Sequence, residues 1–190
     1  MLDEFLSRVR RNHALEHATI NVLSEKNKGF SAQGNSSQRG FHLNIFGEIE
    51  EDQVIEAVEE AYRRLKDGEA ELGLHPNCGT VLLTTATMAA VAAQATFSLE
   101  QRRQKRSSAN LSVIFGALPT AVLAVVIAII ASRPIGMAIQ DRYTVEGNIV
   151  TLQVSSIQMI NPSPVTRLFQ LLLGQANNDH VKAYRIDTIG

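Results

Sequence analysis

Two histidines and a glutamate stand together near the start of the chain, within a segment whose apolar residues recur at helical spacing. His13 and His17 are four residues apart, and Glu16 lies between them on the same stripe. Because residues i and i+4 lie one helical turn apart, both imidazoles can be directed at one ion. The pattern predicts a metal site. The alternative is a polar notch, in which the histidines hydrogen-bond to the backbone or to Glu16.

A second polar cluster, with the sequence HPNCGT at positions 75–80, stands just before a long apolar stretch. Asn77 and Thr80 suit a helix N-cap, so a plain cap with an inert thiol is the simpler interpretation. The functional interpretation is that His75, Cys78 or both complete the site that the two earlier histidines begin. Three or four N or S ligands suit Zn(II): three leave a position open for water, whereas four make a closed structural site.

A zinc ion held by His13, His17 and His75 would carry a water that ionises near neutrality. Glu16 would take the proton of this water, as general base, during attack on an amide or ester carbonyl. Cys78 would be a fourth ligand or line the cavity. Two non-enzymatic interpretations stay open: a membrane protein with a structural metal or a bound tetrapyrrole such as haem, and a metal-free assembly or interaction subunit whose polar notch receives a partner.

Other candidates carry weaker signals. His42 falls on the polar face of a predicted strand, and His180 falls in a predicted loop. The sequence has no glycine-rich phosphate loop, serine elbow or dinucleotide fingerprint. A net charge of -1 argues against a nucleic-acid partner, and a single cysteine excludes an internal disulfide.

Two long apolar stretches dominate the middle of the chain. Residues 80–99 carry no charge, and residues 111–132 are more strongly hydrophobic. Each has about the 20 residues that a helix needs to cross a bilayer, so we expect a transmembrane hairpin with a basic loop at 100–110. We therefore expect a multi-pass protein of the plasma membrane with both termini on one side. The bilayer is its expected partner, and a membrane-protein segment or a lipid-like molecule is its expected substrate.

The two flanks, 1–79 and 133–190, are each too small to bury much surface alone, so we expect them to pack into one α+β domain. The predicted elements are helices at 3–26, 50–66 and 164–173, strands at 29–33 and 40–46 around a turn at 34–37, a strand at 71–74, a hairpin of 143–145 with 149–154, and a strand at 181–189. The expected fold class is an α+β membrane protein, in which this domain accompanies the two-helix hairpin.

The chain resembles a family of small bacterial membrane proteins with an uncharacterised domain. The matching segments are His13-Ala-Leu-Glu-His-Ala-Thr-Ile20, His75-Pro-Asn-Cys-Gly-Thr80, the hydrophobic hairpin and Arg133-Pro-Ile-Gly136. The likeness covers most of the chain. It implies this membrane architecture and leaves the activity unassigned.

The segment His13-Ala-Leu-Glu-His17 is also similar to the motif of the inverted, pitrilysin-like zinc peptidases. That resemblance implies that the two histidines bind zinc and that the glutamate activates water. The peptidases have a further acidic ligand on a downstream helix, which here would fall in the uncharged stretch 80–99. His75 would have to take its place.

Overall fold

The computed structural model describes residues 2–105, 110–163 and 181–190. The chain divides into two compact units, Met1–His75 with Tyr143–Gly190, and Pro76–Arg142. We call the first the sheet unit and the second the hairpin unit, and each is described by itself.

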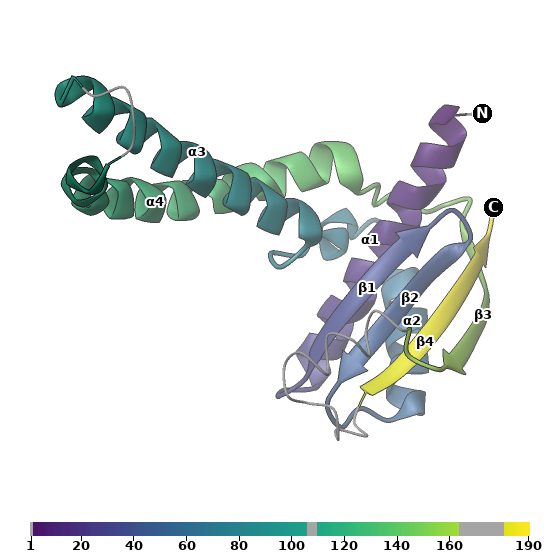
Figure 1. Cartoon of the computed structure of the whole chain (residues 1–190). Helices are drawn as coiled ribbons and strands as arrows, with labels where there is room; N and C mark the ends of the chain where they lie inside the picture. The colour runs from purple at the N-terminus through teal and green to yellow at the C-terminus, as the bar shows by residue number, and fades with distance from the viewer. Residues whose placement is uncertain (1, 106–109, 164–180) are drawn as a thin grey trace. The chain divides into compact units, whose positions relative to one another are not determined.

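The sheet unit is α+β, with strands from both flanks in one antiparallel sheet of order β1-β2-β4-β3 (Figure 1). Its elements are α1 (Leu2–Lys26), β1 (Ser31–Ser37), β2 (Gly40–Phe46), α2 (Glu51–Lys66), the 3-10 turn η1 (Ala70–Gly73), β3 (Gln153–Ile160) and β4 (Val181–Ile189). The predicted helices at 3–26 and 50–66 and the predicted strands at 40–46 and 181–189 are confirmed. The predicted helix at 164–173 lies outside the described residues.

The core of the sheet unit lies between the sheet and the helices α1 and α2. Alternate residues of β2, Phe41, Leu43 and Ile45, are buried, and His42 between them is exposed as predicted. The apolar stripe of α2 is buried against the same core. Burial of this face fixes which residues of the sheet pack against α1 and α2.

The prediction of a turn between β1 and β2 at 34–37 was wrong. The two strands pair from Ser31 with Phe46 to Ser37 with Gly40, so only two residues make the turn. Gly34 lies within β1, where a Cβ would collide with the carboxylate of Glu16. The glycine that looks like a turn signal thus provides room for a side chain of α1.

Two further predicted elements were wrong. Residues 71–74 belong mostly to the 3-10 turn η1. The carbonyl groups of Leu72, Gly73 and Leu74 accept hydrogen bonds from side chains of α1 and not from a partner strand. The predicted hairpin of 143–145 with 149–154 does not form. Residues 140–144 make a π-helical turn (η2), the Glu146 N–H donates to the Arg10 carbonyl, and β3 begins only at Gln153.

The hairpin unit consists of α3 (Gly79–Arg103) and α4 (Leu111–Ile139), both longer than the predicted stretches. Both are long and apolar enough to cross a membrane, and α4, extended to residue 144, is the more hydrophobic of the two. The helices pack closely: Thr85 Oγ1 lies 2.7 Å from Ser132 Oγ, and a Cβ at Gly136 would lie 2.9 Å from Val81 Cα. Small residues at such a contact let two helices approach within a bilayer.

Candidate metal centre

His13 and His17 lie side by side on one face of α1. Their ring centroids are 4.2 Å apart with the planes tilted by 58°, and their candidate ligand nitrogens lie within 4.8 Å of each other. His17 is buried and His13 is half-buried. The helical spacing therefore brings two imidazoles within reach of one ion.

His75 reaches the same place from a distant part of the sequence. The chain leaves α2, makes the η1 turn and continues through Leu74, which is extended, to His75. The ring centroid of His75 lies 5.8 Å from that of His17, with the planes tilted by 43°. The structure thus places the ring of His75 beside that of His17, one of the two motif histidines.

Backbone carbonyl groups orient both motif histidines through the same ring nitrogen. His13 Nδ1 lies 2.9 Å from the carbonyl oxygen of Thr144, and His17 Nδ1 lies 2.9 Å from that of Gly73. A carbonyl oxygen can only accept, so Nδ1 carries the hydrogen in each ring, and Nε2 carries the lone pair of the neutral imidazole. Histidine ligands in metal sites commonly show this arrangement, in which the non-ligating nitrogen donates to a carbonyl or carboxylate.

Glu16 is buried, with 4% of its surface exposed, and its carboxylate contacts β1. Ser36 Oγ donates a hydrogen bond to Oε2, and the absence of a side chain at Gly34 leaves room for the carboxylate. Sequence reasoning missed both of these strand residues. The signal that could have found Gly34 is a glycine in a strand interior, which often marks the close approach of another group.

Cys78 belongs to the hairpin unit and is the N-cap residue of α3. Its Sγ accepts a hydrogen bond from the backbone N–H of Thr80 at 3.4 Å, and the side chain is buried. The cap is therefore Cys78, and not Asn77 or Thr80 as the sequence suggested. The role of Cys78 as a metal ligand stays a prediction.

Of the weaker candidates, His42 is exposed on the sheet, and His180 lies outside the described residues.

Asn21 is a further polar residue of α1 that sequence reasoning missed. Its Nδ2 donates to the carbonyl oxygens of Leu72 at 2.8 Å and of Leu74 at 2.9 Å. The two carbonyl groups flank Gly73, the acceptor for His17. The signal for Asn21 is its position four residues after His17, which places it on the same face of the helix.

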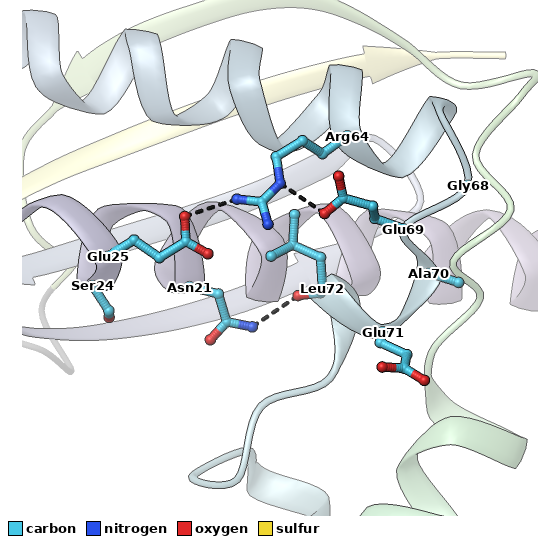
Figure 2. A pocket seen from close by; sticks show the side chains of 9 residues that line it. All are labelled: Asn21, Ser24, Glu25, Arg64, Gly68, Glu69, Ala70, Glu71 and Leu72. Atoms are coloured by element: carbon cyan, nitrogen blue, oxygen red, sulfur yellow. Dashed lines mark hydrogen bonds and ion pairs between the residues drawn. The ribbon is translucent and has the colours of Figure 1, made fainter.

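A shallow hollow of about 830 Å³ lies between η1 and the end of α2, and Asn21 of α1 is among the residues that line it (Figure 2). Arg64 crosses it, with Nη1 2.8 Å from Glu25 Oε2 and Nε 2.9 Å from Glu69 Oε2. The hydrogen bonds that Arg64 donates to Glu25 and Glu69 raise the pKa of its guanidinium group. Among the described residues, none of those that line the hollow is a histidine.

Comparison with known proteins gives two matches. Residues 8–157, which include both polar motifs, match the model of a family described as a domain of unknown function, DUF6391. An uncharacterized protein of Picosynechococcus sp. (strain ATCC 27264 / PCC 7002 / PR-6) is 38% identical in an alignment of 98 residues. The match covers 45% of this chain and 47% of that protein. The match thus spans about half of the relative's length. No solved structure matches the chain.

Proposed function

The chain belongs to the family of the domain of unknown function DUF6391, and we propose that it is a membrane-anchored protein that binds one transition-metal ion through His13, His17 and His75. The observation that carries the proposal is the orientation of the motif histidines, each of which donates Nδ1–H to a backbone carbonyl oxygen. A third imidazole lies 5.8 Å from the second. Neutral imidazoles are common ligands of Zn(II), which is the ion we propose.

The close pair of rings favours this proposal over a plain polar notch. Two imidazolium cations with centroids 4.2 Å apart would repel each other, whereas two neutral imidazoles can bind one cation. A plain notch does not require two imidazoles within reach of one ion, whereas a metal site does.

The number of ligands decides what the ion does. Three histidines would leave a coordination position for water, which supports chemistry, whereas a fourth protein ligand would close the site. Cys78 is the proposed fourth ligand in the closed form, because it follows His75 by three residues in the sequence. A closed site would have a structural role.

Hydrolysis is a second candidate function, and the buried carboxylate of Glu16 on the helix that carries both histidines favours it. In this proposal Glu16 is the general base for a metal-bound water that attacks an amide or ester carbonyl. The substrate would be a segment of a membrane protein or a lipid-like molecule. Support for this substrate class comes from the apolar helix α3, which begins four residues after His75.

We propose further that α3 and α4 cross the plasma membrane as a hairpin, with both flanks of the chain on one side. The length and hydropathy of the two helices support the spans. The pairing of β2 from the first flank with β4 from the second supports a common side, because one sheet cannot form across a bilayer.

The experiment is metal analysis of the full chain, purified in detergent without chelator, together with Co(II) titration followed by visible absorption. We expect about one metal per chain, loss of binding in His13→Ala and His17→Ala, and weaker binding in His75→Ala. The matched control is His42→Ala, which removes an exposed histidine of the same unit and should leave binding unchanged. Wild-type protein that is metal-free and does not bind Co(II) would overturn the proposal.

The same titration separates three ligands from four. Thiolate ligation to Co(II) gives an intense near-ultraviolet charge-transfer band, which imidazole ligands do not give. If Cys78 is a ligand, the wild-type complex shows this band and Cys78→Ser loses it. If the site has three histidines and an open position, the spectrum of Cys78→Ser equals that of the wild type.

A further inference from the structure

We infer that Asn21 is a positioning residue of the metal centre, because it holds the turn that presents His75 and the carbonyl group of Gly73. The inference rests on the proposed metal function and adds to it a residue that touches no metal. It follows from the two hydrogen bonds of one amide group to the two carbonyl groups on either side of Gly73.

His13, His17 and Asn21 recur at every fourth position of α1 and therefore share one face of the helix. The last two make successive contacts with the segment from Leu72 to Leu74. His17 donates to the Gly73 carbonyl oxygen, and Asn21 donates to those of Leu72 and Leu74. Figure 2 shows the amide of Asn21 directed at the Leu72 carbonyl group from α1.

The orientation of the amide follows from its partners. Both acceptors are carbonyl oxygens, so only the NH₂ end of Asn21 can satisfy them, and its two hydrogens match two acceptors. The turn needs these donors because η1 is a single 3-10 turn of four residues, and the carbonyl groups at the end of a short helix lack helical partners. Asn21 thus supplies hydrogen bonds that the turn cannot make for itself.

The consequence for the metal centre is positional. Leu74, whose carbonyl oxygen Asn21 binds, directly precedes His75, and the bond to Leu72 fixes the other side of Gly73. Without the amide, the turn would lose two of the hydrogen bonds that join it to α1 and would keep that from His17. His75 would then have to be ordered when the metal binds, and metal affinity would fall by about 10–100-fold, as for other residues that orient metal ligands.

The test compares variants of the full chain in detergent by their Kd for Co(II). Asn21→Leu keeps the approximate shape without donors, Asn21→Ala removes the side chain, and Asn21→Gln retains the amide. We expect weaker binding by about 10–100-fold for the first two and partial or full recovery for Asn21→Gln. The control is Ser24→Ala, which loses a hydrogen bond to the Ile20 carbonyl oxygen one turn further along α1 and should bind as the wild type does.

A double-mutant cycle with His75→Ala separates positioning from general destabilisation. If Asn21 acts through His75, Asn21→Leu adds little to the loss of affinity already caused by His75→Ala. Equal losses in both backgrounds would overturn the inference, as would wild-type affinity in Asn21→Leu and Asn21→Ala. Failure of the wild-type protein to bind Co(II) would overturn the proposed function together with this inference, so the two failures are distinguishable.

Discussion

His17 donates its Nδ1–H to the carbonyl oxygen of Gly73 over 2.9 Å, across 56 residues of sequence. Gly73 is buried, and a Cβ at this position would lie 3.1 Å from Ala14 Cβ and 3.3 Å from Val145 Cγ1. The missing side chain therefore lets the η1 turn lie directly on α1. This close approach sets the orientation of one candidate ligand and places another, His75, beside it.

Gly73→Ala should move the turn away from α1 and weaken metal binding. The added methyl group meets Ala14 at a distance that few real Cβ contacts show, so we expect a loss of about 1–3 kcal/mol in the free energy of unfolding. The Kd for Co(II) should rise in parallel. Thermal unfolding followed by circular dichroism and Co(II) titration check the two effects.

A compensating substitution tests this explanation. Ala14→Gly removes the methyl group that the new side chain meets, at a cost of about 1 kcal/mol for a glycine in a helix. The double variant should recover metal affinity even though α1 is less stable. If Gly73→Ala binds Co(II) as the wild type does, the close approach is not needed for the site.

Glu16→Gln should separate metal binding from chemistry. The amide has the same shape and can still accept a hydrogen bond from Ser36, so we expect the fold and the metal content to be retained. If Glu16 is the general base, any hydrolytic activity is lost, because an amide cannot take the proton from water. Elemental analysis and assays with amide and ester substrates measure the two properties.

Two outcomes would contradict this role of Glu16. Hydrolytic activity retained by a folded Glu16→Gln protein would exclude it as general base. A fall in metal content or in melting temperature would indicate that the carboxylate is a ligand or a structural partner of β1. Ser36→Ala is the matched variant, since it removes the observed partner and keeps the carboxylate.

Local patterns predicted those parts of the fold in which neighbours along the chain decide the structure. The helical spacing of His13 and His17 was sufficient to predict their common face, and alternation in β2 was sufficient for its buried side. Gly34 was misleading, because glycine is typical of turns and this one accommodates a side chain from α1. The segment 71–74 alternates like a strand, but its carbonyl groups find partners on α1.

The candidate site also combines features that neighbours along the chain decide with features that depend on distant contacts. Its two helical histidines are a local pattern, whereas the place of His75 depends on how η1 packs, which no spacing encodes. Asn21 was missed because a polar residue on a helix usually faces solvent, and its two acceptors lie 51 and 53 residues away. Contacts of this kind become visible only after the chain has folded.

Tyr184→Phe should stabilise the protein or leave its stability unchanged at neutral pH. The ring is fully buried, and its hydroxyl group has no hydrogen-bond partner among the described residues. Removal of an unsatisfied buried hydroxyl group relieves a desolvation cost of about 1–3 kcal/mol. The control is Tyr62→Phe, which loses a hydrogen bond to the Leu152 carbonyl oxygen and should cost about 0.5–1.5 kcal/mol.

The same substitution has a predicted pH dependence. Burial, with smaller contributions from Glu51 and Glu50, raises the pKa of Tyr184 in the folded state. The unfolded chain therefore loses this proton first as the pH rises. The contribution of the Tyr184 phenol to the free energy of unfolding is complete below about pH 10 and falls as the pH rises above it. Tyr184→Phe should reduce this loss of stability at alkaline pH. Melting curves from about pH 8 to about pH 11, a range that brackets the ordinary tyrosine pKa, measure it. An unchanged alkaline slope would mean that other groups cause it.

Cysteine labelling should place both flanks on one side of the membrane and the α3–α4 loop on the other. In a Cys78→Ser background, Ser31→Cys reports on the first flank, Ser155→Cys on the second and Arg102→Cys on the end of α3 next to the loop. All three positions are exposed. In sealed vesicles, a membrane-impermeant maleimide should label the two flank cysteines together and leave the loop cysteine unlabelled, or the reverse, according to vesicle orientation. The physical reason is that β2 and β4, one from each flank, share backbone hydrogen bonds that cannot form across a bilayer. The control is permeabilisation of the vesicles, which should expose all three positions to the maleimide. Equal labelling of loop and flanks in intact vesicles would show that α3 and α4 do not span the membrane.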